Sequence, residues 1–275
     1  MQMISIETRL KLQYFLGGVA IFLLAPLYFG FLRLRGYRIR DLRRLREECR
    51  IQMAGHEGPW LICANHLTMV DSAIIIYAMF SLGRHMTGYR FLPWNMPERD
   101  NFQKNIFLAI LCYVAKCIPV HRGGNSQEMK ELMERCHYLL EKKQNLLIFP
   151  EGGRSRTGRV DIDNYSYGVG RFLDTYRDCR VLCVYLRGDG QDTWGVLPRS
   201  GERFTMYIEA VDLQRSEHSG LRVQRQYAGQ IIQQLAKMEE AYFASHRQRC
   251  CGFDRSSEQG KEPGSALHQP RLHTR

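Results

Sequence analysis

Short apolar runs alternate with stretches of helical character between residues 60 and 244, and this alternation constrains the fold most. Apolar runs bounded by turn-forming residues are typical of buried strands. We expect strands at residues 60–64, 117–120, 146–149, 180–186 and 203–211. Strands that alternate with helices predict an α/β fold, with a mixed, largely parallel sheet flanked by helices.

The predicted helices differ in how clearly the sequence marks them. Residues 72–80 read best as a helix, and residues 106–118 as a buried or interface-docked helix that is too short to cross a bilayer. Asn125 and Glu128 have the spacing of a capping box. The helix after this box carries apolar side chains at helical spacing, namely Met129, Leu132, Met133, Cys136, Leu139 and Leu140. Residues 221–244 read as an amphipathic helix.

Residues 12–32 contain no charged side chain, which predicts an N-terminal membrane helix. A helix of this length could span a hydrocarbon core of roughly 30 Å. A signal peptide is disfavoured because residues 31–35 offer no small-residue cleavage site, and a buried core helix would normally show a polar face. Pro26 removes a backbone donor and invites a kink. Both a spanning helix and one that dips into the membrane without crossing therefore remain open.

Basic residues crowd the C-terminal side of this run. Only Arg9 and Lys11 precede it, whereas seven arginines follow, at positions 33, 35, 38, 40, 43, 44 and 46. The positive-inside bias places the following domain on the cytoplasmic face of a membrane. The same arginines could hold anionic headgroups.

The charge and composition of the chain indicate which classes of partner it can bind and where its parts begin and end. The formal net charge of +11 favours a membrane surface, nucleic acid or an acidic carrier protein. The nine cysteines form no C-x-x-C pair, which favours neither a zinc site nor a disulfide framework and indicates a reducing environment. After about residue 247 the sequence turns to Ser, Gly, Gln and Pro, which predicts disorder. The predicted parts are a membrane and basic segment (1–48), one domain (49–246) and a tail (247–275).

A first motif, Asn65-His66-x4-Asp71, follows the first predicted strand. A neutral imidazole can take a proton from an alcohol near pH 7, and it does so best when a carboxylate holds its other ring nitrogen. A separation of five suits a loop histidine and an aspartate in the first turn of the next helix. The alternative is that His66 caps the loop and Asp71 only caps the helix.

A second motif places two glycines and two arginines at a strand end, in Phe149-Pro150-Glu151-Gly152-Gly153-Arg154-Ser155-Arg156. Glycines allow close approach of backbone N–H groups, and a guanidinium can bind phosphate through two parallel hydrogen bonds. The string is not a P-loop, because Arg159 and Val160 replace the required Lys and Ser or Thr. No G-x-S-x-G elbow makes Ser155 a hydrolase nucleophile. The alternative is a turn with solvated arginines.

A further cation, Arg122, follows the predicted strand at residues 117–120 and is a candidate phosphate ligand. A surface arginine in a turn is the alternative. Arg99 and Lys104 are weaker candidates that we expect to be solvated.

Together, these three stretches resemble the conserved blocks of the glycerophospholipid acyltransferase family, which includes the 1-acylglycerol-3-phosphate acyltransferases. The resemblance spans roughly residues 58–212. The chain departs from the family pattern at Gly153, where threonine is common, at His121, where an acidic or small residue is common, and at residues 181–186, which lack the proline of the fourth block. These departures bear on the acceptor.

The resemblance implies a direct acyl transfer. His66, oriented by Asp71, would deprotonate the acceptor hydroxyl, which attacks an acyl thioester carried on coenzyme A or acyl carrier protein. Backbone donors near the first motif could stabilise the oxyanion. No metal or bound cofactor is implied. The expected substrate-binding residues are Arg122, Glu151, Gly152, Arg154, Ser155 and Arg156, of which the arginines would bind the acceptor's phosphate.

The leading hypothesis is a membrane-bound O-acyltransferase that acts on lysophosphatidic acid. Its alternatives are an acyltransferase for another lysolipid, glycerol phosphate or a lipid precursor, and a non-catalytic lipid-binding membrane protein. The expected partners are a lipid membrane, a lysophospholipid acceptor and the acyl carrier. Nucleic acid is not expected, because only the charge suggests it.

Overall fold

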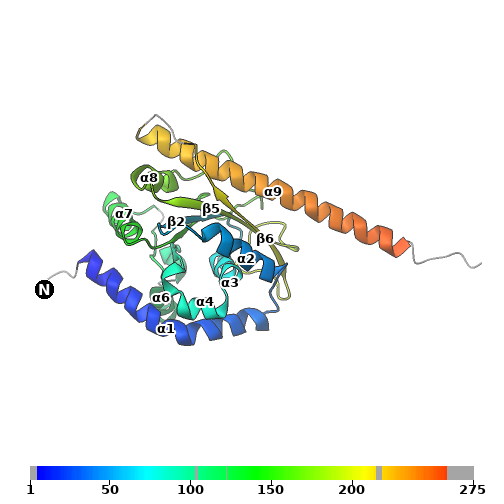
Figure 1. Ribbon diagram of the computed structural model, residues 1–275, viewed down its shortest axis with the longest axis horizontal. Helices are drawn as coiled ribbons and strands as arrows, with labels where there is room; N and C mark the ends of the chain where they lie inside the picture. The colour runs from blue at the N-terminus through cyan, green and yellow to red at the C-terminus, as the bar shows by residue number, and fades with distance from the viewer. Residues whose placement is uncertain (1–4, 103–104, 122, 215–218, 259–275) are drawn as a thin grey trace, which may run out of the picture. The chain divides into compact units, whose positions relative to one another are not determined.

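The computed structural model describes residues 5–102, 105–121, 123–214 and 219–258 (Figure 1). The chain divides into two compact units, Met1–Glu239 and Glu240–Arg275. The first unit contains the sheet and the segments that carry His66 and His121. The described part of the second unit, residues 240–258, is helical.

Six strands form one sheet in the order β1-β6-β5-β2-β4-β3. The strands are β1 (Arg38–Ile39), β2 (Trp60–Ala64), β3 (Trp94–Asn95), β4 (Leu146–Ile148), β5 (Arg180–Gly188) and β6 (Arg203–Val211). Neighbouring strands are parallel except for the antiparallel pair β5–β6. The mixed, largely parallel α/β fold expected from the sequence is therefore confirmed.

Helices cover both faces of this sheet. They are α1 (Ile6–Leu34), α2 (Leu42–Met53), α3 (Asp71–Met79), α4 (Leu82–Thr87), α5 (Arg99–Phe102), α6 (Ile106–Val114), α7 (Ser126–Glu141), α8 (Gly168–Thr175) and α9 (Leu221–Glu258), with a 3-10 turn at Tyr89–Phe91. In Figure 1, α1, α3, α4 and α6 lie below the sheet and α8 lies above it. Helix α7 begins with the predicted capping box, in which Asn125 and Glu128 bond each other's backbone.

Successive side chains of β2 point to opposite faces of the sheet, so the strand contributes to the core on both faces. Trp60, Ile62 and Ala64 point into a cluster that also contains residues of α1, α2 and α3. On β5, the Cys183 thiol lies 4.0 Å from the Ile231 carbonyl oxygen of α9, so α9 covers the other face there. Burial of a large aliphatic side chain such as Ile62 is worth about 1.5–3 kcal/mol.

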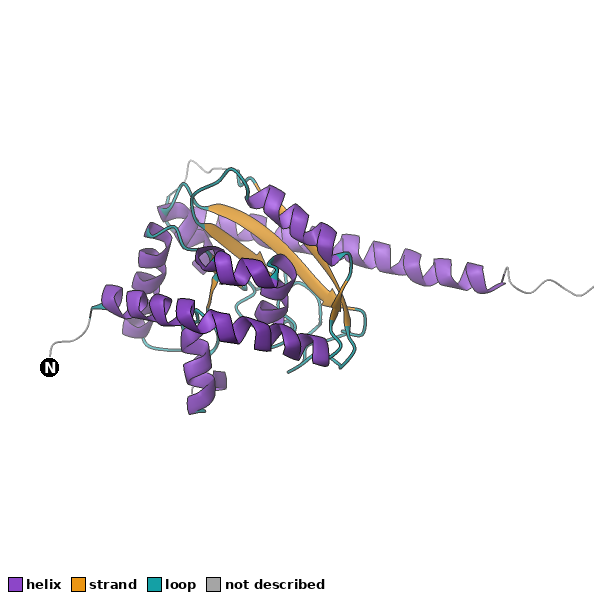
Figure 2. Ribbon diagram, turned by 60° about the horizontal axis from the view of Figure 1, so that its bottom comes forward, coloured by secondary structure: helices purple, strands orange, loops and turns teal. Residues whose placement is uncertain are grey.

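Helix α1 packs lengthwise against the domain. One side of it is buried at Leu10, Gln13, Gly17, Ala25, Phe29 and Leu32, which recur at helical spacing. Gln13 fixes this side to α6 by donating to the carbonyl oxygens of Tyr113 (2.8 Å) and Cys117 (2.9 Å). Figure 2 shows α1 running across the helices beneath the sheet.

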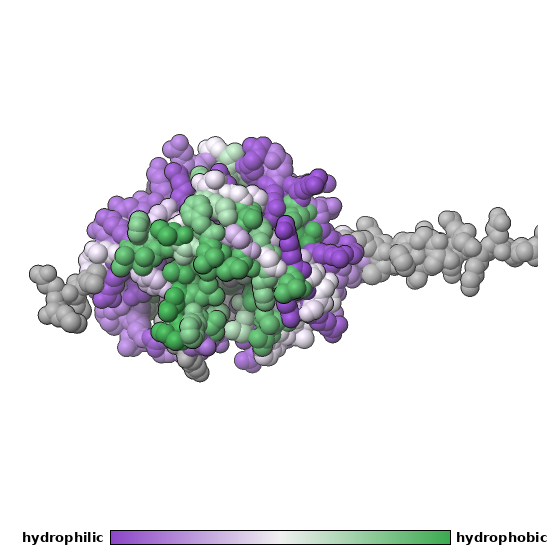
Figure 3. All heavy atoms as spheres, turned by 90° about the horizontal axis from the view of Figure 1, so that it is seen from below, coloured by the Kyte–Doolittle hydropathy of each residue, from purple (hydrophilic) through white to green (hydrophobic). Residues whose placement is uncertain are grey.

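The opposite side of α1 is apolar and exposed. Its exposed side chains are Leu12, Phe15, Leu16, Val19, Phe22, Leu23, Leu27, Phe31 and Leu34. Helix α6 adds Ile106, Phe107, Leu108, Ile110 and Leu111. We call these residues the apolar face, which Figure 3 shows as a broad green area. Within the described residues, α1 is the one helix long and apolar enough to cross a membrane, which by itself is weak support for membrane association.

The arginine-rich segment after α1 is folded into the domain. Arg38 lies in β1, which pairs with β6, and the Arg40 guanidinium lies 2.6 Å from Asp189. On α2, Arg46 donates to the carbonyl oxygens of Tyr77 (2.8 Å) and Ala78 (3.3 Å) in α3. Arg40 thus links the segment after α1 to the loop after β5, and Arg46 links α2 to α3.

The two predicted domain boundaries both fall inside helices of the structure. The division after residue 48 falls inside α2, and the tail expected from residue 247 begins inside α9, while residues 259–275 lie outside the described part. The division of the chain into domains stays a prediction. The strand expected at residues 117–120 was wrong in detail, because Cys117 and Val120 form only isolated bridges with Asn95 and Glu98.

Candidate active site

His66 and Asp71 lie where β2 gives way to α3. His66 is in the loop after β2, and Asp71 is the first residue of α3, as the spacing of five predicted. The His66 Nδ1 atom lies 3.1 Å from Asp71 Oδ2, and the side chains are 13% and 4% exposed. The structure therefore forms a nearly buried imidazole–carboxylate pair.

The Asp71 carboxylate also organises the loop around the histidine. Its Oδ2 atom accepts the backbone N–H groups of Leu67 (2.6 Å) and Thr68 (2.7 Å), and Oδ1 accepts the Thr68 hydroxyl. Because a carboxylate only accepts, the proton of a neutral His66 ring lies on Nδ1. The Nε2 lone pair then remains for chemistry, and Nε2 has no hydrogen-bond partner among the described residues.

The glycine–arginine loop, residues 149–158, is bound directly to this histidine. The His66 N–H donates to Glu151 Oε1 (2.9 Å), and the Ser155 N–H donates to the His66 carbonyl oxygen (2.9 Å). The Phe149 ring stacks on the imidazole with its centroid 4.0 Å away. This contact follows from the sheet, because β2 and β4 are parallel neighbours whose carboxyl ends lie together.

Glu151 is an unusual carboxyl group. Burial raises its pKa to about 8, because the charged form loses its hydration. Its Oε2 atom is buried and has no partner among the residues that the structure describes. Near neutral pH, Glu151 is therefore largely protonated and adds little negative charge beside the arginines.

The same loop presents donors suited to an anion. Gly152 has a φ of +69°, a conformation that favours glycine. In the described part of the chain, the backbone N–H groups of Gly153 and Arg154 have no hydrogen-bond partner. The Arg154 guanidinium donates one bond to the Gly195 carbonyl oxygen (3.0 Å), which leaves its other N–H groups for a ligand.

Two further predicted residues of this loop differ in exposure. Arg156 is exposed, whereas Ser155 is buried and its hydroxyl donates to the Arg159 carbonyl oxygen. Ser155 therefore braces the loop. The roles of both residues in substrate binding stay predictions.

A third segment, residues 192–197, lies between the two loops and was missed by the sequence reasoning. The Gly195 N–H donates to the Leu67 carbonyl oxygen (3.0 Å), and Val196 accepts from the Met69 N–H (3.1 Å). The Thr193 hydroxyl donates to the Arg156 carbonyl oxygen (3.1 Å). No local pattern marks this segment, because all three contacts join residues far apart in the sequence.

The expected oxyanion donors of the first motif are already used. The N–H groups of residues 66, 67, 68 and 69 bond Glu151, Asp71, Asp71 and Val196, respectively. The first motif is thus a rigid support for the imidazole. The N–H groups of residues 66–69 are therefore not free to stabilise an oxyanion.

Comparison with known families agrees with this geometry. The family model described as acyltransferase matches residues 38–184, which is more than half of the chain. The chain belongs to the acyltransferase family. This is the family of the glycerophospholipid acyltransferases, as the resemblance indicated. A search of curated proteins found no match.

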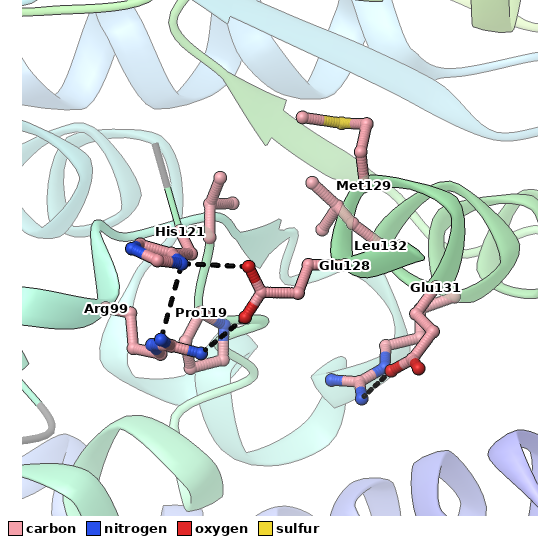
Figure 4. A pocket seen from close by; sticks show the side chains of 9 residues that line it. Arg99, Pro119, His121, Glu128, Met129, Glu131 and Leu132 are labelled. Atoms are coloured by element: carbon pink, nitrogen blue, oxygen red, sulfur yellow. Dashed lines mark hydrogen bonds and ion pairs between the residues drawn. The ribbon is translucent and has the colours of Figure 1, made fainter. Parts of the chain in front are cut away.

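The second block of this family is only partly described here. Arg122 and Lys104 lie outside the described residues, so Arg122 stays a predicted phosphate ligand. His121 faces a cavity of about 220 Å³ (Figure 4). Its Nδ1 atom lies 2.9 Å from Glu128, and Arg99 binds the other oxygen of Glu128 at 3.0 Å. Arg99 is thus paired, although we expected it to be solvated.

Within the described ranges, no group of three or more His, Cys, Asp or Glu side chains is arranged to hold a metal ion.

Proposed function

We propose that this acyltransferase is membrane-bound and moves a fatty acyl group from an acyl thioester to the free hydroxyl of lysophosphatidic acid. One observation carries the proposal. The His66–Asp71 pair is hydrogen-bonded to the loop that presents Arg154, and among the described residues His66 Nε2 and the N–H groups of Gly153 and Arg154 have no partner. A proton acceptor and an anion receptor thus belong to one assembly.

The proposed reaction needs no covalent acyl-enzyme. His66 Nε2 takes the proton of the acceptor hydroxyl, whose oxygen attacks the thioester carbonyl carbon. The tetrahedral intermediate collapses with cleavage of the C–S bond, and the thiolate leaves with the proton from His66. Asp71 holds the ring and stabilises the imidazolium formed in between. Acyl-CoA or acyl carrier protein serves as the donor substrate, so no bound cofactor is needed.

Arginine and backbone donors would place the acceptor. Its phosphate would bind the Arg154 guanidinium and the Gly153 and Arg154 N–H groups, with Arg122 and Arg156 as further ligands. A protonated Glu151 does not repel that phosphate. The alcohol to be acylated would then lie beside the imidazole, which lowers the entropic barrier to reaction.

The packing of α1 supports a helix that lies in the membrane interface. A helix that crosses a bilayer leaves its soluble domain behind, whereas α1 is in contact with the domain from Leu10 to Leu32. The apolar face is then available to lipid, as for interfacial helices. The cytoplasmic leaflet carries a negative surface potential that attracts basic segments, so the excess of arginines after α1 supports a domain on the cytoplasmic face.

An acceptor panel tests the function. Purified protein would be incubated with a radiolabelled acyl thioester and lysophosphatidic acid, other lysophospholipids or glycerol phosphate, and the products separated. We expect the label on lysophosphatidic acid. Preferred labelling of another lysophospholipid or of glycerol phosphate would replace the acceptor but keep the chemistry.

Absence of product on every phosphorylated acceptor would favour a non-catalytic lipid-binding protein. In that case His66→Ala would leave the cellular phenotype of the wild-type chain intact. Under our proposal it removes that phenotype together with turnover.

A further inference from the structure

We propose that residues 192–197 are a lipid-contacting edge of the active site, in which Trp194 steadies Arg154 and enters the headgroup layer of an anionic bilayer with Val196 and Leu197. The inference rests on the proposed function in taking a membrane lipid as the acceptor. We call residues 192–197 the Trp194 segment.

The backbone of the Trp194 segment is fixed, although its side chains are not covered. Gly195 and Val196 bond Leu67 and Met69, on the loop that carries His66. Yet Trp194 is 46%, Val196 59% and Leu197 51% exposed. Large apolar side chains exposed together on a rigid support are typical of an interaction surface.

Trp194 links this surface to the proposed phosphate ligand. The Arg154 guanidinium carbon lies 4.9 Å from the centroid of its indole ring, close enough for a cation–π interaction. The indole N–H has no hydrogen-bond partner among the described residues. A tryptophan with an apolar ring and a free donor suits the boundary between lipid and water.

The position of the segment indicates that its occupant is a bilayer. The next residue, Pro198, accepts hydrogen bonds from the Tyr37 hydroxyl (3.0 Å) and the Arg35 guanidinium (3.5 Å), just after the end of α1. The last turns of α1 expose Phe31 and Leu34, which belong to the apolar face. The Trp194 segment therefore adjoins the surface proposed to meet lipid.

The residues around the active site are bonded both to α1 and to the Trp194 segment. The Tyr28 hydroxyl of α1 donates to the Ala73 carbonyl oxygen in the first turn of α3, the turn that also holds Asp71. On the other side, the Trp194 segment is bonded to the residues that follow His66. A lipid acceptor could then be held at the membrane surface with its phosphate at Arg154.

Charge favours an anionic bilayer. Arginines 35, 154 and 156 are bonded to residues 193–198, and residues 192–199 themselves contain one arginine, Arg199, and one carboxylate, Asp192. Each arginine near an anionic surface adds an electrostatic attraction that a zwitterionic surface does not supply.

Tryptophan fluorescence can test the inference without any turnover. The chain has three tryptophans, and Trp60 and Trp94 are buried at 2% and 0% exposure. The full chain would be mixed with vesicles of phosphatidylcholine alone or with phosphatidylglycerol, with and without brominated acyl chains. We expect a blue shift and quenching by the brominated lipids, stronger with phosphatidylglycerol, and both effects lost in Trp194→Phe.

Matched variants distinguish lipid contact by the Trp194 segment from membrane binding by other parts of the protein. Leu197→Ser should reduce the quenching of Trp194, while Leu221→Ser, at an exposed leucine on α9, should not. Vesicle-bound wild-type protein whose Trp194 is not quenched would overturn the inference. Protein that binds neither vesicle would overturn both this inference and the proposed membrane attachment. Normal quenching with no acyl transfer to any acceptor would contradict the proposed function alone.

The steadying role of Trp194 has its own readout. Trp194→Ala should raise KM for lysophosphatidic acid about three- to tenfold through loss of the cation–π contact, with a smaller change in kcat. Trp194→Phe keeps an aromatic ring and should restore most of that loss. Equal KM values in the wild type and Trp194→Ala would contradict this role.

Discussion

Among the described residues, two histidine–carboxylate pairs follow strand ends or bridges, and they have similar distances but different surroundings. His66 lies 3.1 Å from Asp71 and His121 lies 2.9 Å from Glu128. The first pair is nearly buried, whereas the side chains of the second are 33% and 36% exposed. The two pairs therefore differ in burial but hardly in distance.

The partners of the two carboxylates explain the difference. Asp71 accepts hydrogen bonds from the backbone of its own loop, and no arginine in the described part of the chain is bonded to either side chain of the first pair. Glu128 instead caps α7 and binds Arg99, whose guanidinium also lies 3.3 Å from His121 Nδ1. The second pair is a structural tie in which the carboxylate is shared (Figure 4).

Replacing each histidine by alanine should give the largest difference between the two pairs. His66→Ala should lower kcat/KM by about 10⁴-fold, because it removes the proton acceptor. His121→Ala, the matched loop histidine, should lower it less than about tenfold. Rates of acyl transfer would be measured with lysophosphatidic acid, and thermal unfolding would confirm that both variants fold. Equal losses in the two variants would refute the assignment of the base.

The glutamates that contact the two histidines should respond oppositely to pH. Burial raises the pKa of Glu151 to about 8, whereas a hydrogen bond from His121 lowers the pKa of Glu128. A raised pKa means that the folded state binds the proton more tightly, so stability falls as the pH rises from about 4.5 to about 8. Above that window, Glu151→Gln should be more stable than the wild type by a few kcal/mol.

Urea unfolding on both sides of the window would measure this gain. Below about pH 4.5, where Glu151 is protonated in both states, the difference should disappear. A constant difference at all pH values would show that the carboxyl group is not neutral in the folded protein.

Arg154 and Arg99 should differ in how strongly they contribute to substrate binding. Arg154→Ala should raise KM for lysophosphatidic acid about tenfold to a hundredfold, because a charge-assisted contact with phosphate is lost. Arg99→Ala removes a guanidinium that is already bound to Glu128 and should change KM less than about threefold. Steady-state kinetics with varied acceptor concentration would decide. A larger effect at Arg99 would move the phosphate site to the cavity of Figure 4.

The smallest effect is expected at Glu128. Its lowered pKa means that its contribution to stability is present above its ordinary pKa of 4.5 and is lost as the pH falls through the folded value. Glu128→Gln should therefore slightly reduce thermal stability near neutral pH, with a smaller difference in acid. Differential scanning calorimetry at the two pH values tests this. A stabilised variant would contradict the capping role.

The sequence predicted the parts of the fold that depend on local patterns. β2, β4, β5 and β6 were found from their apolar runs, and α7 from its capping box. β1 and β3 have two residues each and exist only through pairing with distant strands. α2 was hidden by its arginines, although Leu45 and Cys49 mark its buried side.

In the candidate site, too, the contacts that depend on local spacing were predictable and those between distant segments were not. Contact between His66 and Asp71 followed from their short separation, and the parallel sheet brought Glu151 beside them. The Trp194 segment could not be found, because its position depends on bonds to Leu67, Met69, Arg154 and Arg156, which lie far earlier in the sequence. Nor could the sequence show that the N–H groups of residues 66–69 are engaged.

The buried side of α1 has a practical consequence for producing the protein. Phe29 and Leu32 belong to the same core cluster as Ile74 and Tyr77 of α3. Cutting the chain after Leu34 to obtain a detergent-free enzyme would uncover α3 and invite aggregation. Expression designs should keep the first helix and replace only outward-pointing side chains, such as Phe22 and Leu23, with polar ones.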